Sequence, residues 1–324
     1  MFILKGRLEP VANFDVFNGD ADGIISLVQL RLSEPREATR VTGRKRDIKL
    51  LSRVEAGEGD KVTVLDISMR SNAEDLQRVL TAGAEVFYVD HHNAGDMPEA
   101  KNLTALIDTS PEICTAMLVD SHLNGAHRAW AVTAAFGDNF PKLAKRKAEG
   151  NDLPLEQLER LGMLINYNGY GGSVDDLLYH PADLYAELLP FATPMDFLNE
   201  NKAVFDKLEA GYEGDLSNAQ QAKVIDETDT GQVITLADAA GSRRISGVYG
   251  NQLAQDNPKR AHAILTAQDG GYLVSIRAPL SQRSGADTLA LQFETGGGRS
   301  AAAGINHLPE AELDRFIKAF RAAF

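Results

Sequence analysis

The chain has little cysteine, no long apolar run and no start typical of an exported protein. Its 324 residues include one cysteine, Cys114, so a disulfide within the chain is excluded. A lone cysteine fits a reducing compartment. No apolar stretch approaches the roughly 18 residues that a membrane span needs. The first residues lack the basic start and long apolar stretch of a secretion signal. We therefore expect a cytoplasmic protein with no membrane partner.

Positive charge is also scarce. The 33 basic side chains are outnumbered by 46 acidic ones, and the formal net charge is −13. Proteins that hold long nucleic acids use many lysine and arginine contacts to phosphates. The charge balance therefore argues against a long nucleic-acid partner. It leaves open a small anionic substrate in a locally positive, metal-loaded pocket.

Short β-like runs alternate with helical patterns in the first half of the chain, which predicts a doubly wound α/β domain with a mainly parallel sheet. We expect this domain over residues 1–216, with a helical extension from about 141. A polar stretch from 217 to 231 indicates a linker, and a smaller α/β domain follows over 232–324. Strands of the first domain are expected at 14–17, 38–41, 62–67, 85–89, 102–107 and 129–133.

Acidic and histidine side chains follow four of these predicted strands. The carboxyl ends of parallel strands meet at one edge of a sheet, where ligands bind. Any one aspartate alone is more simply a helix N-cap or turn residue. Four together need a cation, because clustered carboxylates repel one another. Such a mixed set suits two divalent ions, Mn²⁺ first and Mg²⁺ or Co²⁺ next. The residues are Asp20, Asp22, Asp66, Asp90, His91, His92 and Asp138.

These residues resemble the motifs of the DHH phosphoesterase superfamily. The later stretch Gly296–Gly304 is similar to the glycine-rich signature of the DHHA1 substrate domain, and Val274–Arg277 resembles the strand before it. The resemblance implies an active site in the cleft between the two domains. The four metal-site motifs correspond to Asp20-Ala21-Asp22-Gly23, Asp66, Asp90-His91-His92 and Asp138.

The resemblance also implies roles for single residues. Asp66 would bridge the two ions, and His92 would face the substrate phosphate. The catalytic residues would be Asp90, His91 and His92. The metal ligands would be Asp20, Asp22, Asp66, His91 and Asp138. The substrate would be held by His92, Arg277, Gly296, Gly297, Gly298 and Arg299.

Two departures from the family pattern stand out. Val16 occupies the position where many members have a histidine, and Asn18 the position where the exonuclease branch has a further aspartate. Asn18 would be a weak neutral ligand, so we expect the first metal to be held more loosely than usual. Arg299 replaces the usual histidine of the glycine-rich signature, and an arginine suits bidentate binding of a phosphate.

Two further segments have alternative interpretations. Arg44-Lys45-Arg46 follows the second strand and would add phosphate contacts, although solvated surface is the simpler fate for most of this trio. The glycine triplet 296–298 would offer backbone N–H groups to a phosphate, and the alternative is a flexible turn.

The sequence thus predicts a metal-dependent phosphodiesterase of short linear oligonucleotides, especially 5′-phosphorylated dinucleotides such as the linear product of cyclic di-GMP breakdown. A water activated by the metals would be the nucleophile. One alternative is a 3′-phosphoadenosine 5′-phosphate phosphatase. Another is a non-catalytic nucleotide sensor whose altered first site has lost one metal. A homodimer is left open.

Overall fold

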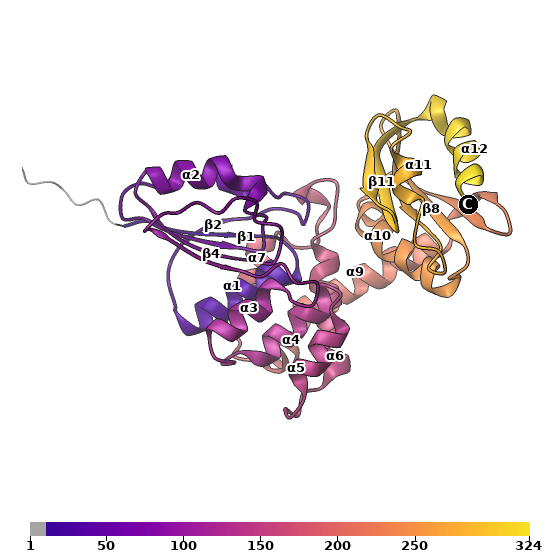
Figure 1. Ribbon diagram of the computed structural model, residues 1–324. Coiled ribbons are helices and arrows are strands. Elements are labelled where there is room, and N and C mark those ends of the chain that lie inside the picture. The colour runs from indigo at the N-terminus through magenta and orange to yellow at the C-terminus, as the bar shows by residue number, and fades with distance from the viewer. Residues whose placement is uncertain (1–10) are drawn as a thin grey trace, which may run out of the picture. The chain divides into compact units, whose positions relative to one another are not determined.

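The computed structural model describes residues 11–324, which form two compact units (Figure 1). The first unit takes in the described chain up to Gly169, together with Leu178–Leu208. The second takes in Tyr170–Leu177 and the chain from Glu209 onward. The predicted architecture, a parallel-sheet α/β unit and a second unit with its own sheet, is confirmed.

A five-stranded parallel sheet forms the centre of the first unit, in the order β2-β1-β3-β4-β5. The chain winds outward from β1 to β2, then returns past β1 to β3 and continues to β5. β1 and β3 therefore flank the point at which the winding reverses, where open α/β sheets bind ligands. The strands are β1 (Asn13–Phe17), β2 (Thr39–Val41), β3 (Lys61–Leu65), β4 (Glu85–Asp90) and β5 (Leu103–Ile107).

Helices cover both faces of this sheet, as Figure 1 shows. On one face, Val62 and Val64 of β3 share a buried core with Leu76 and Val79 of α2, whose spacing of three matches a helical face. On the other face lie α1 and α3, and α1 is buried along most of its length. These helices are α1 (Ala21–Ser33), α2 (Ala73–Thr81) and α3 (Thr115–His122).

A buried ion pair joins β1 to α1. Nε of Arg31 donates to Oδ2 of Asp15 at 2.9 Å, and a second guanidinium nitrogen donates to Oγ1 of Thr63 at 3.0 Å. Both charged side chains are almost fully buried. Removing one partner alone would leave a buried charge without compensation, which typically costs about 3–5 kcal/mol.

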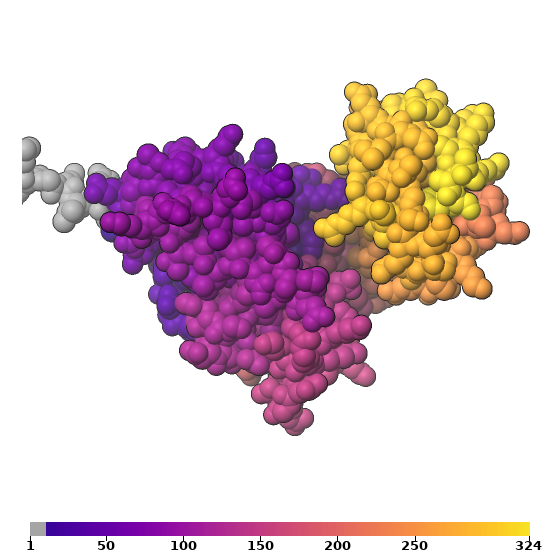
Figure 2. Space-filling view, in the orientation of Figure 1, coloured from indigo at the N-terminus to yellow at the C-terminus, as the bar shows by residue number. Residues whose placement is uncertain are grey.

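The rest of the first unit is helical, as the pattern from about 141 predicted. The turn between α5 and α6 projects from the surface of this unit at the bottom of Figures 1 and 2. No helix in the described part of the chain is long and apolar enough to cross a membrane. The remaining helices of this unit are α4 (Arg128–Gly137), α5 (Pro141–Ala148), α6 (Leu155–Asn168), α7 (Pro181–Leu188), α8 (Pro194–Glu200) and the start of α9 (Lys202–Gln220), with 3₁₀ turns η1 (Leu50–Arg53) and η2 (Arg70–Asn72). The 3₁₀ turn η3 (Val174–Asp176) and the rest of α9 belong to the second unit.

The strand predicted at 129–133 is wrong. These residues belong to α4, whose Trp130, Val132 and Phe136 are buried in the helical layer. The run Ala-Trp-Ala-Val-Thr-Ala-Ala-Phe is apolar on every side, and a short apolar run does not distinguish a buried strand from a buried helix.

A six-stranded sheet forms the second unit, in the order β10-β11-β9-β8-β7-β6. Only β7 and β8 among these described neighbours run parallel. One face packs against Leu289 of α11 and against Phe316 and Phe320 of α12. The elements are β6 (Lys223–Glu227), β7 (Gly231–Leu236), α10 (Ala240–Asp256), β8 (Ala261–Gln268), β9 (Gly271–Arg277), α11 (Ala286–Ala290), β10 (Gly296–Arg299), β11 (Ala302–Pro309), η4 (Glu310–Glu312) and α12 (Leu313–Ala323).

The segment expected to be a linker, 217–231, has regular structure instead. It contains the end of α9, the whole of β6 and the first residue of β7. Asp226 of β6 accepts hydrogen bonds from Arg321 of α12, which ties this strand to the second unit. The polar composition of the segment reflects an edge strand, because β6 lies at the end of its sheet.

Candidate active site

Three carboxylates converge on one nitrogen of His91 at the carboxyl edge of the first sheet. His91 Nε2 lies 3.9 Å from Oδ2 of Asp22, 3.6 Å from Oδ1 of Asp66 and 3.7 Å from Oδ2 of Asp138. Asp66 follows β3 and His91 follows β4, as the sequence predicted. Asp138 reaches the cluster from the C-terminal end of α4, not from a strand.

The orientation of His91 leaves Nε2 available as a ligand. Its other ring nitrogen, Nδ1, lies 2.9 Å from the carbonyl oxygen of Ile113. A carbonyl oxygen only accepts, so Nδ1 carries a proton, and Nε2 is the ring nitrogen that faces the carboxylates and could bind a metal ion. A backbone carbonyl in this role is the usual partner of a metal-binding histidine.

The N-terminus of α3 holds two of the carboxylates. Asp22 accepts hydrogen bonds from the backbone N–H groups of Thr115 and Ala116, each at 2.7 Å. The hydroxyl of Thr115 donates to Oδ1 of Asp66 at 3.0 Å. These hydrogen bonds fix the positions of both carboxylates at the N-terminus of α3, where negative charge is favoured. Nothing in the sequence marked Thr115 for this role.

Two features of Asp66 cost free energy, its backbone conformation and the burial of its carboxylate. Its φ of +58° places a residue with a side chain in the left-handed region, which costs about 1–3 kcal/mol. Burial raises the pKa of Asp66 well above its usual range, and the charges of Asp20 and Asp22 raise it further. Both costs are borne at the residue expected to bridge metal ions.

Asp138 is also electrostatically perturbed. Burial raises its pKa to about 6, and Asp22 and Asp20 add to the effect while Lys45 opposes it. Repulsion among these buried carboxylates is relieved by a cation. Carboxylate oxygens and one imidazole nitrogen are a donor set that suits Mn²⁺ or Mg²⁺. The ligand atoms of Asp22, His91 and Asp138 lie within 4.8 Å of one another, as do those of Asp66, His91 and His92, and each group could hold a divalent ion.

His92 differs from His91 in its partner and its exposure. Its Nδ1 lies 2.7 Å from Oδ1 of Asp90, and its side chain is 46% exposed. The hydrogen bond to Asp90 raises the pKa of His92 above its usual value. Because Nδ1 is engaged by Asp90, His92 fits a contact to an anionic substrate better than a place among the metal ligands. Asp90 acts here as the residue that orients His92.

Lys45 lies inside the acidic cluster. The sequence interpretation placed it at this edge of the sheet as a phosphate contact and did not predict its pairing with the carboxylates. Its Nζ is 2.6 Å from Oδ2 of Asp20 and 3.1 Å from Oδ1 of Asp138. It also donates to Oδ1 of Asn166 in α6 at 3.1 Å. The expectation of solvated surface is therefore wrong for Lys45. No sequence signal placed α6 beside this loop.

Two residues of the first motif region, Asp20 and Asn18, contact Lys45. Asp20 caps α1, accepting from the N–H of Gly23 at 3.0 Å. Burial raises the pKa of Asp20, but the Lys45 ammonium outweighs it, and the net shift is downward. The amide of Asn18 donates to the carbonyl oxygen of Lys45 at 3.3 Å. Val16 is buried in the core and supplies no ligand atom.

In the second unit, the two arginines proposed to bind substrate lie in one row of the sheet. Arg299 of β10 and Arg277 of β9 both pair with Ala302 of β11. Directly paired residues project to the same face, so the two arginines flank a small side chain on one face, two strand spacings or about 10 Å apart. Arg277 is held by Asn251 Oδ1 at 2.7 Å.

The glycine triplet is part of strand β10, so the alternative of a flexible turn is wrong. Binding of a phosphate by its backbone N–H groups stays a prediction. A Cβ on Gly296 would lie 1.7 Å from the carbonyl oxygen of Ala290, and one on Gly298 would lie 2.4 Å from Cα of Ala303. Close packing therefore requires these two glycines. A Cβ on Gly297 would meet nothing within 4 Å, and Gly297 shares the face of Arg299.

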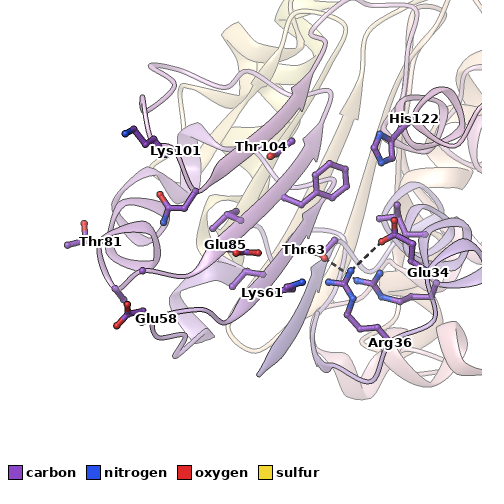
Figure 3. A pocket seen from close by; sticks show the side chains of 18 residues that line it. Glu34, Arg36, Glu58, Lys61, Thr63, Thr81, Glu85, Lys101, Thr104 and His122 are labelled. Atoms are coloured by element: carbon purple, nitrogen blue, oxygen red, sulfur yellow. Dashed lines mark hydrogen bonds and ion pairs between the residues drawn. The ribbon is translucent and has the colours of Figure 1, made fainter. Parts of the chain in front are cut away.

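A separate hollow of about 870 Å³ lies at the opposite edge of the first sheet (Figure 3). It is lined by residues from the amino ends of β3, β4 and β5, including Lys61, Glu85 and Thr104. Its lining mixes both signs of charge and contains none of the converging carboxylates. The hollow is therefore distinct from the candidate site.

Comparison with known proteins gave matches among solved structures. No family model and no curated protein matched. A DHH-domain member of the s1p family of ribosomal proteins matches with a TM-score of 0.62 at 13% identity, over 96% of this chain and 86% of that one. Exonuclease RecJ bound to manganese matches with a TM-score of 0.62 at 16% identity, over 97% and 90%.

A pGpG-specific phosphodiesterase from Vibrio cholerae matches with a TM-score of 0.56 at 17% identity, over 97% of this chain and 100% of that one. At these identities the likeness establishes the fold. The chain shares the fold of these DHH-domain proteins, as its motifs predicted.

Proposed function

We propose that the chain is a metal-dependent hydrolase of phosphate esters that cleaves short linear oligonucleotides, above all 5′-phosphorylated dinucleotides. The observation that carries this proposal is the convergence of Asp22, Asp66 and Asp138 on Nε2 of His91. Such a cluster is expensive to bury without a cation, and it lies where α/β sheets bind ligands.

A divalent ion, when bound, supplies a hydroxide at neutral pH and neutralises charge on the reacting phosphate. Asp22, Asp66, His91 and Asp138 would hold it, with Mn²⁺ as our first choice. His92, kept in place by Asp90, offers an exposed cationic donor to a phosphate oxygen. The chain's own residues thus bind and orient the substrate and leave bond cleavage to the water.

Preference for short substrates rests on charge and on the second unit. Arg277 and Arg299 flank Ala302 and lie on the same face as Gly297, a combination of two cations and small residues that accommodates a terminal phosphate. The net charge of −13 disfavours a long polyanion. The likeness in fold to a pGpG-specific phosphodiesterase supports a dinucleotide, and the expected location is the cytoplasm.

A nucleotide sensor is the second candidate, and one observation favours it. Lys45 occupies part of the acidic cluster through its ion pairs with Asp20 and Asp138. If this cation prevents the chemistry, the chain would bind nucleotides without cleaving them.

The test is turnover of a substrate panel with Mn²⁺. The panel contains 5′-phosphorylated RNA and DNA dinucleotides, a longer oligomer, 3′-phosphoadenosine 5′-phosphate and pyrophosphate. We expect fast cleavage of dinucleotides that declines with length. Turnover of the bisphosphate alone would make the protein a phosphatase, and tight binding without turnover would make it a sensor.

A further inference from the structure

The position of Lys45 divides the acidic cluster into two parts. Its ammonium lies between Asp20 and Asp138, and Asn166 supplies a third oxygen at 3.1 Å. The second part is the group around His91 Nε2. Asp138 belongs to both, because Oδ1 faces Lys45 while Oδ2 lies 3.7 Å from His91.

Backbone contacts fix the loop that carries Lys45. The N–H of Lys45 donates to the carbonyl oxygen of Gly169 at 2.9 Å, and its own carbonyl accepts from Asn18. A Cβ on Gly19 would lie 1.8 Å from the carbonyl oxygen of Gly43, so the two loops touch through backbone alone. The Cα of Lys45 is therefore anchored beside the first motif, unlike that of a lysine on a mobile surface loop.

Few ligand atoms around Lys45 are left for a second divalent ion: both oxygens of Asp20 have partners, and Asn18 contributes only a neutral amide oxygen, which makes no hydrogen bond. Asp20 uses one oxygen for the N–H of Gly23 and the other for Lys45. Asn18 turns its amide N–H toward the Lys45 carbonyl, and Val16 offers no donor atom. A second divalent ion here would have to displace the ammonium of Lys45 and would find few ligand atoms.

We infer that the ammonium of Lys45 takes the place of one of the two metal ions, so that this centre binds a single divalent ion through Asp22, Asp66, His91 and Asp138. This inference rests on the proposed metal-dependent function. It revises the expected two-metal site: Asp20 becomes the partner of a built-in cation. An ammonium neutralises carboxylates but does not activate water, so a single ion would carry that task.

Metal stoichiometry tests the inference directly. Metal-free protein is titrated with Mn²⁺, and bound ions are counted by calorimetry and by the electron paramagnetic resonance signal of free Mn²⁺. We expect one ion per wild-type chain and two per Lys45→Ala chain, because the variant exposes Asp20, Asp138 and Asn166 without their cation.

Two further variants serve as controls. Lys45→Arg keeps the positive charge and should bind one ion. Arg46→Ala removes the same charge from the exposed neighbouring position and should also bind one. Circular dichroism checks folding, and if Lys45→Ala does not fold, the neutral Lys45→Met replaces it. Two ions in the wild type, or one in folded Lys45→Ala, would overturn the inference.

Counting ions separates this inference from the proposed function. One bound ion with no hydrolysis would preserve the role of Lys45 and reject the enzyme. Two bound ions with hydrolysis would reject the role of Lys45 and preserve the enzyme.

Discussion

At the scale of single residues, two adjacent histidines differ in role because their partners differ. His91 donates a hydrogen bond from Nδ1 to a backbone carbonyl, and its Nε2 faces three carboxylates. His92 is bound to Asp90 and is nearly half exposed. We therefore expect the Asp-His-His tripeptide to combine a metal ligand, a substrate contact and the residue that orients that contact.

We expect Asp66 to be needed for turnover but not for folding. Asp66→Asn should keep the left-handed backbone, because asparagine tolerates that conformation, while it removes a buried charge. We expect kcat to fall by more than about 10²-fold, as when one electrostatic group of an active site is lost, with the free energy of unfolding of the metal-free protein unchanged or higher. Steady-state kinetics and urea unfolding measure both, and Asp96→Asn, on an exposed loop, is the control. Retained activity would remove Asp66 from the centre.

Arg299 should act on binding. Arg299→Ala is expected to raise KM for a 5′-phosphorylated dinucleotide with little change in kcat, because the contact lies away from the scissile bond. Arg283→Ala, an exposed arginine of the same unit, should leave KM unaltered. An unchanged KM in Arg299→Ala would refute the proposed clamp.

At the scale of elements, β10 shows why a glycine triplet is not one functional unit. Gly296→Ala should lower the free energy of unfolding by about 1–3 kcal/mol, because its Cβ would overlap the Ala290 carbonyl. Gly297→Ala should be neutral or slightly stabilising, since alanine orders a strand better than glycine. Urea unfolding compares the two. Equal losses of unfolding free energy in the two variants would show that the room available for a Cβ does not decide the effect.

The docking of η3 against α10 depends on pH. Hydrogen bonds from Arg243 lower the pKa of Asp176 to about 2, although burial opposes the shift. A lowered folded-state pKa stabilises the fold above the unfolded value near 3.9, and this contribution is lost as pH falls toward 2. Asp176→Asn should therefore cost about 1–2 kcal/mol at pH 7 and less at pH 3. Exposed Asp175→Asn is the control for urea titrations at both values; a loss that does not depend on pH would argue against this origin.

The elements also show what the sequence could and could not predict. Strand ends that carry Asp66 and His91 were predictable, because alternating β and helical patterns fix a parallel sheet and its ligand edge. The helix that presents Asp138 was not, since its apolar run has no helical period. Lys45 and Thr115 were missed because loop and helix packing brings them to the site from segments distant in sequence.

At the scale of the whole molecule, a strongly acidic chain places a few cationic side chains at the candidate binding positions. The chain carries a net charge of −13, yet Lys45, His92, Arg277 and Arg299 stand at the positions assigned to metal or phosphate. A local positive charge on an acidic protein favours small anions over long polyanions. Its motifs and its two sheets agree with the fold of DHH-domain proteins.

Hydrolysis of a 5′-phosphorylated dinucleotide tests the metal-dependent centre most directly. It is measured for the wild type and for His91→Ala, each with Mn²⁺ and with a chelator. We predict turnover by the wild type with Mn²⁺ alone, and loss of that turnover in His91→Ala. Equal turnover by the two proteins, or turnover that survives the chelator, would contradict a metal-dependent centre built on His91.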